Sequence, residues 1–480
     1  MASASPAQRC SPQPTRSPGA PPPFPDPFAA DPSLAGLLAG ATELLCRWLA
    51  GAADRPPLPG LTPLPPLAPE AGGLPPERLL ADLQLLMDGA YNPGHPGALA
   101  HLDPPPLAAS IAAELICAGL NNNLLAEELS PSLSRLERGL SAWLAEAIGL
   151  PAGAGGVAAS GGSLSNLMAL VTARHSRGLA TRADAVVLCS ADAHVSLEKA
   201  VSVMGLPTSA LQRLPVDQDG RLDPQALGER LQTLQHQAIP VIAVVATAGT
   251  TVRGAVDPLA RIAALCRAYQ QWLHVDGAIG AVFALAPALA HQLAGLGEAD
   301  SVTVNPQKLL GITKTSSLLL LADPRLLGRS FATGLPYMEP SREGDHGGEA
   351  GLQGTRPAEI LKLWLGLRQL GLEGIAALVE ASVARRQRLQ DLLASDGRLL
   401  LRGGPLHLLA FRPVGCSGEA AAAWSATTRQ RLLADDLMLS RPCYQGSHHL
   451  KAVLGNPHTR PCDLERLARV VHDSLPAPCR

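Results

Sequence analysis

Residues 299–321 read ADSVTVNPQKLLGITKTSSLLLL and contain two short apolar runs of the kind that form buried strands, 301–305 and 316–322. Three similar runs come earlier in the chain, at 185–189, 241–247 and 271–276. Helical patterns separate these runs. Strands that alternate with helices predict an α/β domain with a mainly parallel sheet and helices on both faces.

Working outward from this region, the sequence divides into four parts. Prolines and serines dominate the first part, which we expect to be disordered. The second part has helical stretches at 31–51 and 77–89, with Asp31 as a helix cap, joined by a proline-rich extended connector. The last part has an α+β pattern: a helix, a hairpin, a helix, a strand and a final helix. The expected parts are a disordered tail (1–30), an N-terminal helical segment with its connector (31–90), a large domain (91–365) and a small C-terminal domain (366–480).

Composition excludes several classes of protein. A formal net charge of −2 over 480 residues gives no electrostatic case for binding nucleic acid or an anionic membrane. The first residues lack the apolar region of a signal peptide, and no apolar run reaches the roughly 18 residues of a membrane span. The nine cysteines show no metal-ligand spacing, so we expect no metal site and a reduced, cytoplasmic protein.

Lysine is rare in this chain. The sequence has 39 lysines and arginines, and only five are lysines: Lys199, Lys308, Lys314, Lys362 and Lys451. Arginine stays charged in proteins, whereas a desolvated lysine amine can become a neutral nucleophile. The pair within residues 299–321 therefore suggests a Schiff-base lysine, although a solvated surface charge is the ordinary explanation for any one lysine.

Polar residues follow the predicted strands. His194, Thr247, Asp276, Asn305 and Lys308 each stand at or just beyond the end of an apolar run. Ligands of open α/β sheets bind beyond the carboxyl ends of the strands. Each residue alone could be a cap or a strand end, but an acid, a histidine and a lysine at one sheet edge together predict a ligand site.

A glycine-rich loop supplies a second feature of such a site. Gly161 and Gly162 precede Ser163 and a helical run, and a helix N-terminus of this kind offers N–H groups and a positive dipole end to a phosphate. Residues 153–158 match a dinucleotide-binding pattern. They follow a predicted helix rather than a strand, and Arg174 stands in the region where that pattern requires an acid, so we do not favour a nicotinamide site.

These features together describe a pocket for pyridoxal 5′-phosphate. The aldehyde of this cofactor needs an amine, which Lys308 would provide, and its pyridine nitrogen needs an anion, which Asp276 would provide. His194 would lie against one face of the ring, and Gly277 with Ala278 would leave a gap for it.

Eight segments in order resemble the group II pyridoxal phosphate-dependent amino-acid decarboxylases, the family of glutamate, aromatic amino-acid and diaminobutyrate decarboxylases. The segments are HP at 95, SGGSLSN at 160, AHVSLEKA at 193, ATAGTTVRGAVDP at 246, HVDGAIG at 274, NPQKLL at 305, QGTRPAEILKLW at 353 and LKAVLGNPHT at 450. The resemblance covers about residues 90–460.

The resemblance implies fold type I, as in aspartate aminotransferase, and a homodimer whose active sites are shared between the chains. It implies that Lys308 binds the cofactor covalently, and that the enzyme converts an L-amino acid to its amine and carbon dioxide. The cofactor-binding residues would be Gly162, Ser163, His194, Thr247, Asp276, Asn305, Gln307 and Lys308.

This chain departs from the family pattern at three places. Gln307 stands where the family has histidine, and glutamine cannot carry a proton. The segment after HP, which is aromatic in the aromatic amino-acid enzymes, places His101 and Asp103 in the substrate wall. Lys451 stands where the family offers an arginine to the substrate carboxylate. With the segments HLDPPPL and LNNNLLAEELSP, these residues are most similar to the diaminobutyrate branch and favour a non-aromatic substrate, diaminobutyrate-like or acidic.

A glycine-rich loop that holds Tyr337 completes the expected catalytic set. In the family a tyrosine of this loop reaches into the partner's site and protonates the substrate carbon after carbon dioxide leaves, so Lys308, Tyr337 and His194 are the expected catalytic residues. The alternative is a homologue with lost or changed activity, an aminotransferase or a carbon–sulfur lyase, with Gln307 as the sign of the change.

Overall fold

The computed structural model describes residues 24–340, 346–395 and 397–476. Most of the predicted disordered tail, residues 1–23, lies outside the described residues. The chain divides into two compact units, Met1–Ala52 with Pro59–Ala90, and Ala53–Leu58 with Tyr91–Arg480.

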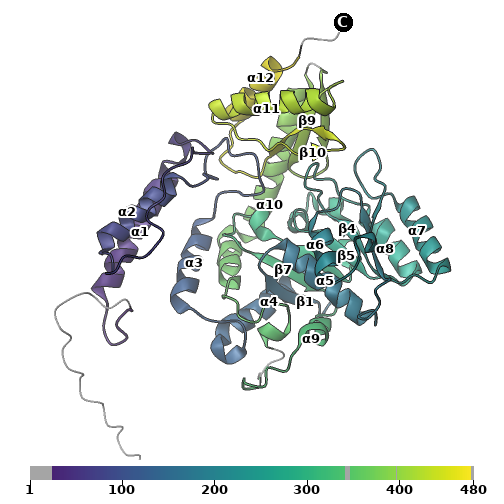
Figure 1. The fold of residues 1–480 in the computed structure, drawn as a ribbon, viewed down its shortest axis with the longest axis horizontal. Helices are drawn as coiled ribbons and strands as arrows, with labels where there is room; N and C mark the ends of the chain where they lie inside the picture. The colour runs from purple at the N-terminus through teal and green to yellow at the C-terminus, as the bar shows by residue number, and fades with distance from the viewer. Residues whose placement is uncertain (1–23, 341–345, 396, 477–480) are drawn as a thin grey trace, which may run out of the picture. The chain divides into compact units, whose positions relative to one another are not determined.

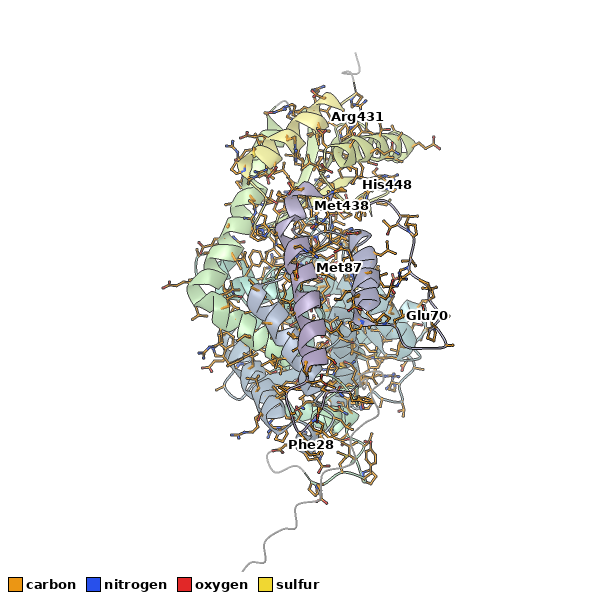
Figure 2. The ribbon with its side chains drawn as sticks, turned by 90° about the vertical axis from the view of Figure 1, so that its left-hand side faces the viewer. Phe28, Glu70, Met87, Arg431, Met438 and His448 are labelled. Atoms are coloured by element: carbon orange, nitrogen blue, oxygen red, sulfur yellow. The ribbon has the colours of Figure 1, made fainter. Side chains whose placement is uncertain are left out.

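The smaller unit is a pair of helices, α1 (Pro32–Ala50) and α2 (Pro76–Asp88), which pack against each other. Asp31 caps α1 as predicted, because its carboxylate accepts hydrogen bonds from the backbone N–H groups of Ser33 and Leu34. Met87, labelled in Figure 2, lies near the end of α2. Its carbonyl accepts a hydrogen bond from the indole of Trp48 (3.0 Å), which links the two helices.

The larger unit is built on a seven-stranded sheet with the strand order β1-β7-β6-β5-β4-β2-β3. Only β7 runs antiparallel to its neighbours, so the sheet is mainly parallel, as predicted. The strands are β1 (Gly155–Ala159), β2 (Val186–Ser190), β3 (Leu211–Leu214), β4 (Val241–Thr247), β5 (Leu273–Gly277), β6 (Ser301–Val304) and β7 (Ser317–Leu321).

Two of these strands are absent from the sequence prediction. Residues 155–159, read as part of a loop, form β1 at the edge of the sheet beside β7. A Cβ at Gly156 would lie 1.9 Å from the carbonyl oxygen of Leu319, so glycine is required for this pairing. The glycine-rich composition that makes the strand hard to recognise is therefore what allows the close approach. The other missed strand, β3, is short and lies at the opposite edge.

Helices cover both faces of the sheet (Figure 1). Alternate strand residues face opposite sides: Leu188 and Val244 belong to one apolar core, and Val187 and Val245 to the other. The first core includes residues of α4, α7, α8 and α10, and the second includes residues of α5, α6 and α9. The helices are α3 (Ala108–Leu120), α4 (Pro131–Ala147), α5 (Gly162–Ser176), α6 (Ser196–Val203), α7 (Pro224–His236), α8 (Leu259–Ala268), α9 (Arg325–Phe331) and α10 (Ile360–Ala394).

The C-terminal part has the predicted α+β pattern. An antiparallel sheet of order β12-β9-β8 packs with the C-terminal part of α10 and two further helices around its own apolar core. The expected division after residue 365 falls inside α10, whose helical geometry is interrupted at Gly371 (φ 63°), so the separation of a small domain stays a prediction. The elements are β8 (Leu399–Gly403), β9 (Leu408–Pro413), α11 (Gly418–Ala434), β10 (Cys443–Tyr444), β11 (Ser447–His448), β12 (Leu450–Val453) and α12 (Pro461–Asp473).

Candidate active site

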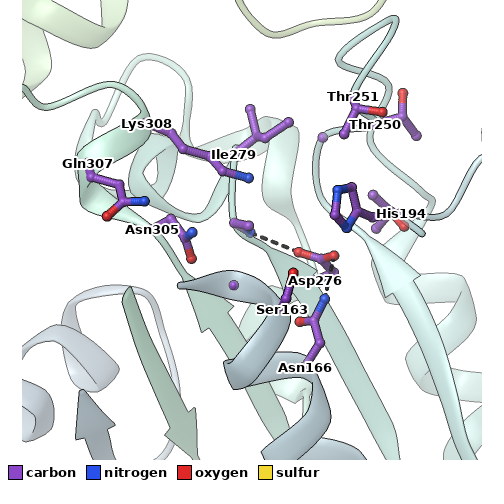
Figure 3. Close-up of a pocket in the computed structure, with 14 residues that line it drawn as sticks. Ser163, Asn166, His194, Thr250, Thr251, Asp276, Ile279, Asn305, Gln307 and Lys308 are labelled. Carbon is purple, nitrogen blue, oxygen red and sulfur yellow. Dashed lines mark hydrogen bonds between the residues drawn. The ribbon is translucent and has the colours of Figure 1, made fainter. Parts of the chain in front are cut away.

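A cavity of about 250 Å³ lies at the carboxyl ends of β4, β5 and β6, next to the N-terminus of α5 (Figure 3). The parallel topology brings these strand ends together, although they come from distant parts of the sequence. All eight residues expected to bind the cofactor line this cavity: Gly162, Ser163, His194, Thr247, Asp276, Asn305, Gln307 and Lys308.

Lys308 ends a short 3-10 turn, Pro306–Lys308, directly after β6. Burial lowers the pKa of its amine, and the negative charges of Asp276 and Asp103 oppose this shift only in part. Within the described residues its Nζ makes no hydrogen bond or ion pair. The amine is therefore available as a nucleophile inside the cavity.

Asp276 is buried on β5 (6% exposed) and faces the same cavity. Its Oδ2 accepts a hydrogen bond from Asn166 Nδ2 at 2.8 Å, and its Oδ1 accepts one from the N–H of Ala278 at 3.2 Å (Figure 3). Two donors compensate in part for the burial of the carboxylate and leave lone pairs for a further donor in the cavity.

His194 lies near Asp276 in the same view (Figure 3). Its Nδ1 accepts the N–H of Ser196 at 3.1 Å, at the start of α6, so the ring caps that helix and also lines the cavity. Burial lowers the pKa of the imidazole, Asp276 raises it, and the positive charge of Lys308 lowers it further. The ring is thus held neutral, with its proton on Nε2.

The N-terminus of α5 supplies backbone donors. The first N–H groups of a helix have no partner within the helix, and here they belong to Gly162, Ser163 and their neighbours. In the orientation of the Asn305 amide that satisfies both of its ends, Oδ1 accepts the N–H of Gly162 at 3.2 Å and Nδ2 donates to Ser317 Oγ at 2.8 Å. Asn305 therefore joins β6 to the helix terminus at the cavity wall.

Gln307 and Gly277 have structural tasks that the sequence does not reveal. Gln307 lines the cavity, but its Oε1 accepts the backbone N–H of Ser316, so the amide also holds the loop that leads into β7. The expected gap at Gly277 and Ala278 is only partly correct. A Cβ at Gly277 would lie 2.8 Å from the Cβ of Ala281 and 2.9 Å from the carbonyl oxygen of Thr303, so this glycine allows close packing, and Ala278 alone lines the cavity.

None of the three residues expected to contact substrate, His101, Asp103 and Lys451, is among the described residues that line this cavity. The charges of Lys451 and Asp103 both act on the pKa of His101, and each also interacts with Lys308. Asp103 forms an ion pair with Lys314 (2.6 Å). Lys451, on β12, donates a hydrogen bond to the carbonyl of Thr251 (3.1 Å), a residue of the cavity wall.

Tyr337 does not line the cavity of its own chain. It lies in the segment after α9, and its side chain is 72% exposed. Its proposed task in a neighbouring subunit stays a prediction.

The sequence interpretation missed Asn166 as a site residue. Asn166 lies in the first turn of α5, four residues after Gly162, and donates to Asp276. Helix periodicity carries the signal, since residues spaced by three or four share a face with the glycines already singled out.

These groups fit pyridoxal phosphate. A mostly buried amine, a carboxylate and a neutral ring surround one cavity that also has a helix N-terminus suited to a phosphate. The buried hydroxyl of Thr247, inside the same wall, makes no hydrogen bond within the described residues and can serve a bound group.

Two further observations concern the described part of the chain. Its seven cysteines are all free, and no three of its histidine, cysteine or acidic side chains gather as metal ligands would. None of its helices combines the length and the apolar character needed to cross a bilayer.

Comparison with known proteins assigns the chain to a family. Residues 64–412 match the family model described as the pyridoxal-dependent decarboxylase conserved domain. The L-2,4-diaminobutyrate decarboxylase of Rhizobium meliloti (strain 1021) is 34% identical over 389 residues, which covers 79% of this chain and 78% of that protein. The cysteine sulfinic acid decarboxylase of Homo sapiens is 32% identical over 309 residues, 62% of each chain.

Solved structures share the fold. The structure of Oryza sativa TDC with PLP and tryptamine has a TM-score of 0.87 at 22% identity, and covers 94% of this chain and 98% of its own. A glutamate decarboxylase domain from Vibrio parahaemolyticus has a TM-score of 0.81 at 24% identity, with 92% and 95% covered. These likenesses place the described chain in fold type I. From its family match and its relatives, this chain belongs to the group II pyridoxal phosphate-dependent amino-acid decarboxylases, in the diaminobutyrate decarboxylase branch.

Proposed function

We propose that this enzyme decarboxylates a non-aromatic L-amino acid with a second charged group, diaminobutyrate-like or acidic. The observation that carries the proposal is that Lys451 donates a hydrogen bond to the carbonyl of Thr251 in the cavity wall, while the charge of Asp103 acts on the pKa of Lys308. The cavity-lining residues among those described include no phenylalanine, tyrosine or tryptophan, which supports a polar substrate. Two relatives named L-2,4-diaminobutyrate decarboxylase, at 34% and 29% identity, favour the diaminobutyrate-like choice.

The cofactor would be held by four kinds of contact. Lys308 would bind it covalently, Asp276 would accept the hydrogen bond of its ring nitrogen, and His194 would lie against the ring. Its phosphate would lie at the N-terminus of α5, where Ser163 offers a backbone N–H group, with Gly162, Thr247, Asn305 and Gln307 completing the wall.

The substrate carboxylate would be recognised by Lys451, whose charge lies near the cavity. For a diaminobutyrate-like substrate the second amine would face Asp103 and His101, and Lys314 would release part of its hold on Asp103. Lysine keeps the positive charge expected at position 451 without the two-pronged geometry of arginine, which makes carboxylate recognition less directional.

Bound pyridoxal phosphate supplies the electron sink that accepts the electron pair released as the bond to the carboxylate breaks. The α-carbon of the substrate then needs a proton. Tyr337 of the partner subunit would deliver it, and the exposure of Tyr337 in its own chain leaves its hydroxyl available for this task. We therefore propose a homodimer, acting in the cytoplasm, with active sites completed across the interface.

Carbon dioxide release from a panel of L-amino acids tests the substrate. The panel holds 2,4-diaminobutyrate, glutamate, cysteine sulfinate and tryptophan, and Lys308→Ala serves as the inactive control. We expect carbon dioxide from diaminobutyrate or an acidic member and none from tryptophan. Product formation only when a keto acid is added, without carbon dioxide, would instead identify an aminotransferase.

Mixing two inactive variants tests the shared site. In a hybrid dimer of Lys308→Ala and Tyr337→Phe chains, one site receives both an intact lysine and an intact tyrosine if the tyrosine serves its partner. Random reassociation should then restore activity to about a quarter of the unaltered level. If each tyrosine serves its own chain, both sites of every hybrid stay defective and the mixture stays inactive.

A further inference from the structure

A continuous chain of hydrogen bonds lies behind Asp276, in the interior of the sheet. Trp272 Nε1 donates to Ser301 Oγ (3.0 Å), and Ser301 Oγ contacts His274 Nδ1 (2.9 Å). His274 Nε2 contacts Asn166 Oδ1 (3.1 Å), and Asn166 Nδ2 donates to Asp276 Oδ2 (2.8 Å). All five side chains are buried, His274 and Ser301 completely.

The chemistry of the groups fixes the direction of every hydrogen in this chain. An indole nitrogen can only donate, so the oxygen of Ser301 accepts from Trp272. The amide oxygen of Asn166 can only accept, so His274 Nε2 donates to it, and Nδ1 of the neutral ring accepts the hydrogen of Ser301. Burial lowers the pKa of His274 to about 4, so the ring is neutral near pH 7. Its single proton then lies on Nε2 and points to the amide oxygen of Asn166.

Two more residues complete the hydrogen bonds of the Asn166 side-chain amide. Thr303 Oγ1 donates to the amide oxygen (2.7 Å), and the amide nitrogen donates to Ser196 Oγ (2.9 Å) as well as to Asp276. The oxygen of Asn166 thus has two donors and its nitrogen has two acceptors. No other orientation of the amide satisfies these partners.

We propose that Asn166 is a positioning residue, oriented by the His274–Ser301–Trp272 chain, which holds the carboxylate of Asp276 in place to accept the ring N–H of pyridoxal phosphate. The proposal rests on the placement of the cofactor ring against Asp276 given above. Asp276 Oδ2 takes the amide N–H of Asn166 and Oδ1 takes the N–H of Ala278, so each oxygen keeps a lone pair for the ring.

We call the hydrogen-bonded series Trp272–Ser301–His274–Asn166 the relay. The opposite orientation of the Asn166 amide shows why the relay matters for Asp276. If the amide of Asn166 were turned, its oxygen would face a carboxylate oxygen in a buried site. Two acceptors at such a distance repel, so the carboxylate of Asp276 would lose the hydrogen bond that fixes its position and would be pushed out of place. A displaced Asp276 could no longer accept the ring N–H of the cofactor, which the electron sink requires.

The test compares two ligands on cofactor-free protein: pyridoxal phosphate and 1-deazapyridoxal phosphate, in which C–H replaces the ring nitrogen. Asn166→Leu removes the amide at similar size, and Ser301→Ala breaks the relay two residues further away. Ser190→Ala is the matched control, because Ser190 is also fully buried on a strand of the sheet and its hydroxyl makes no hydrogen bond within the described residues.

We expect Asn166→Leu to weaken the binding of pyridoxal phosphate about 10-fold to 100-fold, the range for a lost hydrogen bond to a charged group. Binding of the deaza analogue should change less than about 3-fold, because it offers Asp276 no N–H. Ser301→Ala should also reduce the preference for pyridoxal phosphate over the deaza analogue, by a smaller factor. Ser190→Ala should leave this preference unchanged.

Equal weakening of both ligands would show a merely structural role for Asn166 and overturn the proposal. Should Asn166→Leu fail to fold, an unchanged ligand preference in Ser301→Ala overturns the relay by itself. If the unaltered protein binds both ligands equally, Asp276 does not hydrogen-bond the ring nitrogen. The proposed placement of the cofactor and the proposed relay would then both be wrong. Both the placement of the cofactor and the relay are supported if the parent prefers pyridoxal phosphate to the deaza analogue and only Asn166→Leu and Ser301→Ala lose this preference.

Discussion

Replacing Lys451 by methionine should stabilise the protein and impair substrate binding at the same time. Burial, and next the positive charge of Lys308, lower the pKa of Lys451 from 10.5 to about 8. A difference of this size corresponds to about 3 kcal/mol against the charged amine in the folded protein. The hydrogen bond to Thr251 offsets about 1.5 kcal/mol of this. Methionine keeps the apolar stem without the charge, so we expect the free energy of unfolding of the cofactor-free protein to rise by about 1–2 kcal/mol at pH 7.

The stability difference between Lys451→Met and the parent should depend on pH, in a direction that follows from the lowered pKa of Lys451. A lysine with a lowered folded pKa binds its proton more weakly in the folded chain than in the unfolded chain. Its penalty is present in full below pH 8 and disappears as the pH rises towards 10.5. The advantage of Lys451→Met over the parent should therefore shrink across that range.

Urea unfolding at pH 7 and pH 9.5 measures the stability of Lys451→Met, and steady-state kinetics measure its KM. We expect KM to rise about 10-fold to 100-fold, because the substrate carboxylate loses a charged donor. Lys199→Met is the control: Lys199 is exposed on α6, so its loss should change stability by less than about 0.5 kcal/mol. A Lys451→Met protein that is less stable than the parent and has an unchanged KM would refute the reasoning.

Three further predictions concern other parts of the larger unit. Tyr337→Phe should lower amine production about 100-fold while cofactor affinity stays within a few-fold, and amine formation at the parent rate would move the proton donor elsewhere. Arg356→Met should reduce the free energy of unfolding by about 3–5 kcal/mol, because it leaves the buried carboxylate of Glu137 without its ion pair; an unchanged urea midpoint would contradict this. Burial lowers the pKa of His407 to about 3, so this ring should cost the folded protein about 2 kcal/mol when the pH falls from 7 to 5. His407→Leu should show a smaller loss of stability over that range, and parallel losses in variant and parent would exclude His407 as the cause.

Much of the sheet could be predicted from the sequence because its inner strands are buried on both faces. The run 241–247 is apolar almost throughout, and it forms β4 over the predicted residues. By contrast, β1 is rich in glycine, and its strand conformation depends on pairing with β7. The local sequence pattern of residues 155–159 does not predict this pairing.

The part of the site that lies at the ends of the strands could be predicted from the sequence. Asp276 lies near the end of β5 and Lys308 follows β6, and parallel strands bring such residues to one edge whatever lies between them in the sequence. The ion pair between Asp103 and Lys314 joins two segments far apart in the chain, so it needs the tertiary structure. The proposed task of Tyr337 depends on a second chain, which the sequence of one chain indicates only by resemblance.

Borohydride reduction of the enzyme with bound pyridoxal phosphate tests the central assignment most directly, because it makes the bond between the cofactor and its lysine permanent. The chain has only five lysines, so peptide mass spectrometry can assign the labelled one without ambiguity. The site described above predicts the pyridoxyl group on Lys308. A label on Lys314, Lys451 or another lysine, or no label at all, would contradict it.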